Sequence, residues 1–276
     1  MAGKLFVVPT PVGNLSDMTP RAIEVLSKCD LILAEDTRTS SVIMRHFGIT
    51  TPMISNHKFN EHNIIQNITN KLLSGENIAL ISDAGTPAIS DPGFLISREC
   101  RRNNIPVETL PGATAFVPAL VNSGLPCERF TFEGFLSVNK QSRFEHLQSL
   151  KQEKRTMIFY EAPHKLQNTL CDMLKYFGNR EIALCRELTK IHEEVINTTF
   201  EDAIAMYEEN RPIGEFVLIV SGKQDEKDVE YTLEIAIEMA QRLCESGMQM
   251  TKAAKEVAAE TGFKKGDIYK GLIENQ

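Results

Sequence analysis

Short apolar runs alternate with amphipathic stretches over residues 1–124 of the chain. Each apolar run is short enough for a buried strand, and each stretch that follows has the spacing of a helix with one apolar face. Repeated alternation of this kind is typical of a largely parallel sheet covered by helices. Strands are therefore predicted at 5–8, 31–34, 52–55, 77–81 and 106–110. Helices are predicted at 20–28, about 40–48, 61–73 and 94–102, and a further helix ends near residue 124.

The alternation becomes less regular beyond residue 124, where a mixed sheet with helices is the simplest interpretation. Strands are predicted at 130–136, 156–160, 181–184, 193–198 and 216–220, and helices at 141–150, 164–177 and 201–209. A charged linker at 222–228 leads into helices at 233–244, at 250–260 and from 265 on, and the glycine turn between the last two matches a helix-turn-helix pattern. The predicted division is an α/β domain at 1–124, a second at 125–224, and a helical tail at 225–276.

The composition fits a folded protein without a membrane anchor. A chain of 276 residues with 42% hydrophobic content is long enough for two domains and a small appendage. No apolar run reaches the roughly 18 residues of a membrane span, and residues 1–8 are too short for a secretory signal, so we expect a cytoplasmic protein. The cysteines form no C-x-x-C pair, which favours free thiols over a zinc or redox site: Cys29, Cys100, Cys127, Cys171, Cys185 and Cys244.

The net charge of −7 is not that of a typical nucleic-acid-binding domain, but the charge is unevenly spread. Basic residues gather between Lys140 and Lys165, and Arg98, Arg101 and Arg102 form a second group. Each group is either a solvated helix face or a phosphate-binding surface. The tail holds more acidic than basic residues, which favours packing or dimer support over contact with nucleic acid there.

The loop at 82–93 has the residues that a ligand-binding loop needs. It follows an apolar strand, and ligands of open α/β sheets bind outside the carboxyl ends of the strands. Gly85 and Gly93 permit a positive φ or a close approach of the backbone, and Asp83 offers a carboxylate. A plain turn from strand to helix is the alternative, because Pro92 also suits the start of a helix.

Three other predicted strands also end in polar loops, at 9–17, 35–38 and 111–115. The first of these contains only Gly13, so it lacks the G-x-G-x-x-G pattern of dinucleotide-binding folds. The loops therefore indicate a ligand site at one edge of a sheet, but not a dinucleotide site of the G-x-G-x-x-G type.

Six motifs occur in the order and at the spacing of a known family. Four follow strands of the first domain and read Pro-x-Pro-x-Gly-Asn-Leu (9–15), Ala-Glu-Asp-Thr-Arg (34–38), Ser-Asp-Ala-Gly-Thr-Pro-x-Ile-Ser-Asp-Pro-Gly (82–93) and Pro-Gly-Ala-Thr-Ala (111–115). The second domain adds Phe-Tyr-Glu-Ala-Pro-His (159–164) and Arg-Glu-Leu-Thr-Lys (186–190). Over nearly its whole length the chain resembles the tetrapyrrole methylase superfamily, and within it the bacterial branch that methylates 16S ribosomal RNA.

The resemblance implies two α/β domains with S-adenosylmethionine in the cleft between them, usually in a homodimer. It implies methyl transfer to the ribose 2′-hydroxyl of a cytidine in the decoding region of 16S ribosomal RNA, offered free or in the small ribosomal subunit. Cobalamin-pathway members read Gly-Asp-Pro where Ser82, Asp83 and Ala84 stand here, a departure that favours the ribosomal branch. The alternatives are methylation of a small tetrapyrrole and a non-catalytic RNA-binding protein of ribosome assembly.

The resemblance also carries site residues onto this chain. The cofactor would contact Pro11, Val12, Asp83, Ala84, Gly85, Thr86, Thr114, Ala115, Tyr160, Leu184, Cys185, Arg186, Gly214 and Glu215. Side chains near the predicted cleft are available to hold RNA phosphates, either bidentately or as point charges. The basic candidates are Arg38, Lys140, Arg143, Lys165 and Lys190.

A ribose hydroxyl is a weak nucleophile, so a general base that takes its proton would help the transfer. The candidates are Glu161, Glu187 and Asp36, with Glu35 and His164 also near the predicted cleft. For each acid, an ordinary ion pair with a nearby arginine is the alternative. No metal is expected, because the five-residue spacing of His57 and His62 does not place both on one helical face.

Overall fold

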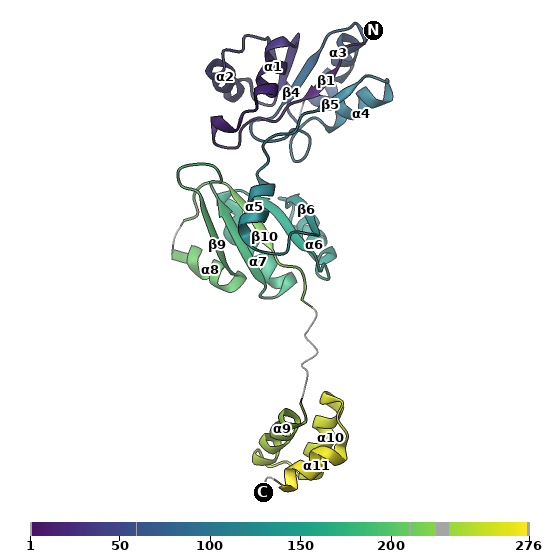
Figure 1. The fold of residues 1–276 in the computed structure, drawn as a ribbon, viewed down its shortest axis with the longest axis vertical. Coiled ribbons are helices and arrows are strands. Elements are labelled where there is room, and N and C mark those ends of the chain that lie inside the picture. The colour runs from purple at the N-terminus through teal and green to yellow at the C-terminus, as the bar shows by residue number, and fades with distance from the viewer. Residues whose placement is uncertain (1, 59, 210, 225–231, 275–276) are drawn as a thin grey trace. The chain divides into compact units, whose positions relative to one another are not determined.

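The computed structural model of the chain describes residues 2–58, 60–209, 211–224 and 232–274 (Figure 1). The chain forms two compact units, Met1–Lys223 and Gln224–Gln276. The larger unit contains two five-stranded sheets with helices on their faces, and the smaller unit is helical. This is the predicted fold class of two α/β domains with a C-terminal helical part. Of the linker predicted at 222–228, residues 225–228 lie outside the described residues.

The first sheet is parallel throughout, as the alternating pattern predicts. Its strands lie in the order β3-β2-β4-β1-β5. The central strand β4 is buried at every position, which is why its sequence is an uninterrupted apolar run. The strands are β1 (Leu5–Val7), β2 (Leu31–Ala34), β3 (Met53–Ser55), β4 (Ile78–Ile81) and β5 (Val107–Thr109).

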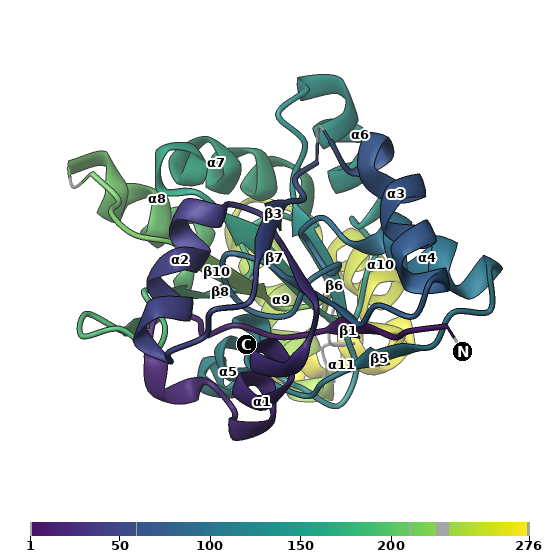
Figure 2. The same cartoon turned by 90° about the horizontal axis from the view of Figure 1, so that it is seen from above.

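Four helices cover the two faces of this sheet (Figure 2). Helices α1 (Pro20–Lys28) and α2 (Thr37–His46) pack on one face, and α3 (Glu61–Leu73) and α4 (Phe94–Arg102) pack on the other. Successive side chains of a strand point to opposite faces of the sheet. Ala79 therefore packs in the core beneath α1 and α2, and Leu80 packs in the core beneath α3 and α4. A short 3-10 helix, η1 (Leu15–Asp17), precedes α1.

Helix α2 begins at Thr37, earlier than the predicted residue 40. The reason is the side chain of Asp36, which accepts a hydrogen bond from the backbone nitrogen of Arg38 at 2.8 Å and caps the helix. The polar motif after β2 is therefore already the first turn of a helix.

The second sheet is mixed, also as predicted. Its strands lie in the order β6-β7-β10-β8-β9, and only the pair of β6 and β7 is parallel. The strands are β6 (Phe130–Phe135), β7 (Thr156–Glu161), β8 (Glu181–Arg186), β9 (Glu194–Thr199) and β10 (Phe216–Val220). The helices that follow in this part of the chain are α6 (Lys140–Ser149), η2 (Pro163–Lys165), α7 (Leu166–Phe177) and α8 (Phe200–Glu209).

Helix α5 (Phe116–Ser123) packs on the second sheet, although the predicted boundary at residue 124 assigns it to the first domain. Its buried residues Ala119 and Leu120 share a core cluster with Ile158 of β7 and Ala183 of β8. The thiol of Cys185 also donates to the carbonyl oxygen of Ala119 at 3.6 Å. By its packing, α5 therefore belongs with the second sheet, because its apolar face finds its partners there.

The C-terminal unit contains α9 (Leu233–Glu245), α10 (Met250–Thr261) and α11 (Lys265–Glu274). Small side chains such as Ala236, Ala240 and Ala253 form its core together with Val257 and other apolar residues. Gly262 ends α10 in the left-handed conformation, with φ of 76°. No helix in the described part of the chain is long and apolar enough to cross a membrane.

Candidate functional site

A cavity of about 450 Å³ lies in the larger unit, and residues from both sheets line it. The first sheet contributes the loops that follow its parallel strands, including Val12 after β1, Glu35 after β2 and Thr114 after β5. The carboxyl ends of parallel strands meet at one edge, which is where ligands of such sheets bind. The second sheet contributes Tyr160 of β7 and Val217 of β10, among others.

The loop at 82–93 is tied to the two loops beside it. The backbones of Thr10 and Gly85 exchange two hydrogen bonds, of 2.9 and 3.0 Å. The hydroxyl of Thr86 donates to the carbonyl oxygen of Ala113 at 3.0 Å. Gly85 has φ of 80°, a conformation that favours glycine, so the sequence at this point fits the backbone that the loop needs.

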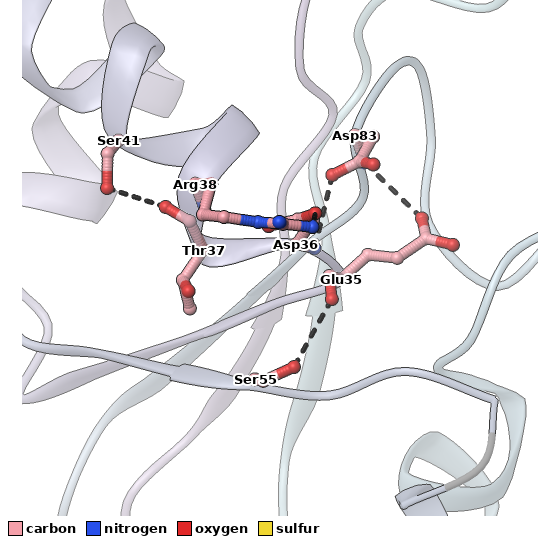
Figure 3. A network of polar contacts seen from close by, with 7 residues as sticks. All are labelled: Glu35, Asp36, Thr37, Arg38, Ser41, Ser55 and Asp83. Carbon is pink, nitrogen blue, oxygen red and sulfur yellow. Dashed lines mark hydrogen bonds and ion pairs between the residues drawn. The ribbon is translucent and has the colours of Figure 1, made fainter.

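Three carboxylates from this side, those of Glu35, Asp83 and Asp91, line the cavity together. The backbone nitrogen of Asp83 donates to Glu35 Oε2 at 3.4 Å, and that of Asp36 donates to Asp83 Oδ1 at 3.2 Å (Figure 3). Burial raises the pKa of Glu35 and of Asp83. Burial, helped by the charge of Glu35, raises the pKa of Asp91 to about 6. This side of the cavity therefore favours a positively charged ligand.

Aromatic side chains of the second sheet also line the cavity. The ring centroids of Phe135 and Tyr160 lie 5.5 Å apart, in an edge-to-face arrangement. Burial raises the pKa of the Tyr160 hydroxyl to about 12, so this residue is neutral. These rings offer a flat apolar contact for a ring system.

Glu161 is buried at the end of β7, and its carboxylate is held on both sides. Its Oε1 accepts from the backbone nitrogen of Ala162 at 2.8 Å, and its Oε2 accepts from the hydroxyl of Thr169 at 2.6 Å. Glu161 therefore lines the cavity with a fixed orientation.

Glu187 and Glu215 hold Lys190 at the edge of the cavity. Lys190 Nζ donates to Glu187 Oε1 at 2.9 Å and to Glu215 Oε2 at 3.4 Å. The ion pair lowers the pKa of Glu187, mainly through the hydrogen bond from Lys190. Gly214 packs against this group, since a Cβ at that position would lie 2.6 Å from Glu187 Cγ. Glu187 is therefore held in its ionised form, and Lys190 already has two partners.

Most of the predicted cofactor residues line the cavity, and four do not. Those that do are Val12, Asp83, Ala84, Gly85, Thr86, Thr114, Ala115, Tyr160, Cys185 and Glu215. Leu184 points to the opposite face of β8, into the core with Phe159, because side chains alternate along a strand. Arg186 pairs with Glu194 at 2.9 Å, and Pro11 and Gly214 lie beside the lining residues Val12 and Glu215.

Asp36 and Arg38, predicted as a base and an RNA contact, form an ion pair with each other. Arg38 Nη2 donates to Asp36 Oδ2 at 2.6 Å, and the pair lowers the pKa of Asp36 to about 2. Asp36 does not line the cavity, whereas its neighbour Glu35 does. An acid with so low a pKa is a poor proton acceptor near neutral pH.

The other predicted RNA contacts are scattered over the unit. Arg143 Nε donates to Asp172 Oδ2 at 2.8 Å, and the side chain is only 19% exposed. Lys140 Nζ lies 5.4 Å from the centroid of the Phe144 ring, and Lys165 lies in η2. Of the basic candidates, only Lys190 lines the cavity.

Asp91 is the functional candidate that the sequence did not single out. It lies in the predicted ligand loop, but its raised pKa comes from burial and from Glu35, which is far away in the sequence. Ile89, Ser90 and Phe135 also line the cavity without having been predicted. Within the described residues, no group of three or more His, Cys, Asp or Glu side chains is arranged to hold a metal ion.

Comparison with known proteins identifies the family. The family model of tetrapyrrole (corrin/porphyrin) methylases matches residues 4–204, so the chain belongs to this family. It is 46% identical over 273 residues to ribosomal RNA small subunit methyltransferase I of Synechocystis sp., covering 99% of this chain and 98% of the relative. The protein of the same name from Escherichia coli O157:H7 is 42% identical, with 99% and 96% covered.

Solved structures with other substrates in their names share the fold. Uroporphyrin-III-C-methyltransferase from Thermus thermophilus matches with a TM-score of 0.56 and 21% identity, over 79% of this chain and 94% of that one. Cobalt precorrin-4 methyltransferase, a cobalamin biosynthetic enzyme, matches with a TM-score of 0.59 and 14% identity, with the same coverage. These similarities support the two-sheet architecture of the larger unit.

Proposed function

We propose that this chain transfers the methyl group of S-adenosylmethionine to the 2′-hydroxyl of a cytidine ribose in the decoding region of 16S ribosomal RNA. The observation that carries the proposal is the similarity, over nearly the full length, to relatives named ribosomal RNA small subunit methyltransferase I. The structures named for porphyrin and cobalamin enzymes match at only 21% and 14% identity, which supports a common fold and not a common substrate. A homodimer, which the resemblance implies, stays a prediction.

The cavity fits S-adenosylmethionine in size and in charge. Its volume of about 450 Å³ lies within the range of small-molecule sites, about 300–1,000 Å³. The described residues that line it include six carboxylates, which suit the positive sulfonium and ammonium groups of the cofactor. When bound, the cofactor supplies a methyl group that its sulfur already activates. The chain's own task is then to align the hydroxyl with this methyl group and to exclude water. The residues that would hold the cofactor are Val12, Asp83, Gly85, Thr86, Thr114, Ala115 and Tyr160.

Asp91 is the lining carboxylate best suited to accept the proton of the ribose hydroxyl. Its pKa of about 6 lies close to neutral, where a general base is most effective. Of the three sequence candidates, Asp36 and Glu187 have a lowered pKa because of their ion pairs, and both oxygens of the Glu161 carboxylate accept hydrogen bonds. We therefore propose Asp91 as the general base that accepts this proton. The charge of Glu35 acts on Asp91 as that of a second acidic group.

Asp83→Ala is expected to weaken the binding of S-adenosylmethionine about tenfold. The substitution removes one charged hydrogen-bond acceptor from the cavity, and a hydrogen bond to a charged group contributes about 1.5–3 kcal/mol. Isothermal titration with the cofactor measures the change directly. Asp17→Ala is the matched control, because Asp17 is an exposed acid of η1 outside the cavity. Equal affinities of the two variants would contradict the assignment of Asp83 to the cofactor site.

Methyl transfer to three acceptors offered in parallel tests the proposed function. The purified protein would receive tritiated S-adenosylmethionine and either unmodified small ribosomal subunits, free 16S RNA or a tetrapyrrole precursor. We expect label in the RNA of one of the first two. Label in the tetrapyrrole alone would assign the chain to the other substrate class, and cofactor binding without any transfer would support a non-catalytic role.

A further inference from the structure

A second hollow, of about 460 Å³, lies between α4 and the edge strand β5. The two elements lie side by side in Figure 1 and contact each other. Its lining includes Phe94, Arg98 and Arg101 of α4 and Val107 and Thr109 of β5; we call this hollow the α4 groove. Thr86 and Ile89 line both the cavity and the α4 groove, so the groove continues from the site of methyl transfer.

The two hollows differ in charge. In the described part of the chain, six carboxylates and one basic side chain, that of Lys190, line the cavity, and two of the carboxylates hold Lys190. Among the described residues, the lining of the α4 groove includes two arginines and no acidic side chain. A phosphate group is repelled from the first and attracted to the second. An RNA strand with its reacting ribose in the cavity therefore has a basic surface in the adjoining α4 groove.

Arg98 and Arg101 are available for such contacts. Both side chains are exposed, and neither forms an ion pair in the described part of the chain. By contrast, Arg38 and Arg143 are each bound to an aspartate. In the sequence, these arginines belong to one of two basic groups that fit either a solvated helix face or a phosphate-binding surface.

An exposed aromatic ring lies next to these charges. Phe94 is 59% exposed, although phenylalanine is usually buried, and Ile89 beside it is 55% exposed. The guanidinium carbon of Arg98 lies 5.2 Å from the centroid of the Phe94 ring. Aromatic rings and guanidinium planes are the surfaces on which proteins stack unpaired bases.

The N-terminus of α4 is itself already occupied. The backbone nitrogens of Gly93, Leu95 and Ile96 donate to Oε1 of Glu61 at 3.0, 3.1 and 3.3 Å. These groups are the ones that would otherwise bind a phosphate at a helix start. The contacts to RNA must therefore come from the side chains of α4, which Glu61 holds in place.

We propose that the α4 groove binds a single-stranded stretch of RNA next to the nucleotide that enters the cavity. Arg98 and Arg101 bind its phosphates, and Phe94 stacks on one of its bases. A single strand fits because the reacting nucleotide must leave its helix to reach an enclosed methyl group. The inference rests on the proposed function and adds the surface that holds the substrate.

The test is the binding of a fluorescently labelled single-stranded oligoribonucleotide to the full chain, measured by anisotropy at several salt concentrations. Arg98→Ala combined with Arg101→Ala is expected to weaken binding at least tenfold. It should also reduce the slope of log affinity against log salt by about 1.4, since each lost phosphate contact in a single strand contributes about 0.7. Phe94→Ala is expected to weaken binding about tenfold with an unchanged slope, because stacking is uncharged.

Arg45→Ala is the matched control, because Arg45 is exposed on α2 and lines neither hollow. All variants should keep the wild-type melting temperature and affinity for S-adenosylmethionine. The proposal is overturned if the double variant binds the oligonucleotide like the Arg45 control, or if the wild-type chain binds no RNA.

The methyl-transfer assay separates this inference from the proposed function. If the wild type methylates no RNA but binds it through Arg98 and Arg101, RNA binding in the α4 groove is supported and the proposed methyltransferase function is contradicted. If the double variant methylates ribosomal RNA with an unchanged KM, the proposed function is supported and RNA binding in the α4 groove is contradicted.

Discussion

Asp91→Asn is expected to transfer methyl groups about 10²–10⁴-fold more slowly than the wild type, because it removes the general base. The amide keeps the size of the side chain but has no lone pair basic enough to take the hydroxyl proton. Binding of S-adenosylmethionine and of RNA should change far less than kcat. Single-turnover rates at saturating substrates measure the effect. A variant with kcat within threefold of the wild type would contradict the role of Asp91.

The pH dependence of the wild type provides a second test of Asp91. Its pKa is raised to about 6, so the carboxylate loses its basic form as pH falls through 6. We expect kcat to fall about tenfold per pH unit below this value and to be level above it. In Asp91→Asn, the residual kcat should not fall as the pH drops below 6.

The same variant is expected to be more stable than the wild type at high pH. The pKa of Asp91 lies above the ordinary value of 3.8, so the folded state holds the proton more tightly than the unfolded state does. The cost of burying the charge is absent below pH 3.8, grows as pH rises to about 6, and is constant above it. With allowance for the partial exposure of Asp91, this cost is about 1 kcal/mol.

Thermal unfolding measures this gain in stability. At pH 8 the melting temperature of Asp91→Asn should exceed that of the wild type by about 2–4 °C, and at pH 4 the two should agree. Asp17→Asn is the control for a general change of net charge, because Asp17 is exposed. A variant that is both slower and more stable is what a base held in a costly environment predicts. Equal melting temperatures at pH 8 would show that Asp91 is ionised without cost.

Glu61→Ala is expected to destabilise the larger unit by about 3 kcal/mol. Glu61 is only 6% exposed, and its carboxylate accepts three backbone hydrogen bonds from the start of α4. Gly93, the N-cap residue of α4, has no side chain to replace them. Alanine would leave buried nitrogens without acceptors and would remove a negative charge from the positive end of the helix dipole.

Urea or thermal unfolding measures the loss, which corresponds to a melting temperature lower by about 6–12 °C. Glu61→Gln keeps an acceptor oxygen and should lose only about 1 kcal/mol. Glu24→Ala, which removes the exposed partner of Lys28 on α1, should leave the melting temperature nearly unchanged. If Glu61→Ala is no less stable than Glu24→Ala, the contacts to α4 contribute little to the fold.

Much of the fold follows from local pattern. The strands β2 and β10 coincide with the apolar runs that predicted them, because a strand covered on both faces contains almost no polar residue. Helix α3 coincides with the predicted 61–73, since it is long and periodic. The placement of α5 could not be predicted, because an apolar helix face does not specify which of two sheets will cover it.

The site was predictable in its loops and much less so in its chemistry. The loop at 82–93 lines the cavity, as its glycines and its position after β4 suggested. The pKa of Asp91 depends on Glu35, and the pairing of Arg143 depends on Asp172 of another helix. The contact of Glu61 with α4 was also invisible, because an acidic residue in the first turn of a helix is ordinary in itself. Such properties arise only when distant segments pack together.

The most direct test of the central claim is to identify the methylated nucleoside. Small ribosomal subunits that lack the modification would be treated with the protein and isotopically labelled S-adenosylmethionine, and their RNA digested to nucleosides for mass spectrometry. We predict label in 2′-O-methylcytidine from a single site of 16S RNA. Label on a cytosine base, on another nucleoside or on none would contradict the claim that this cavity directs a methyl group to a cytidine ribose.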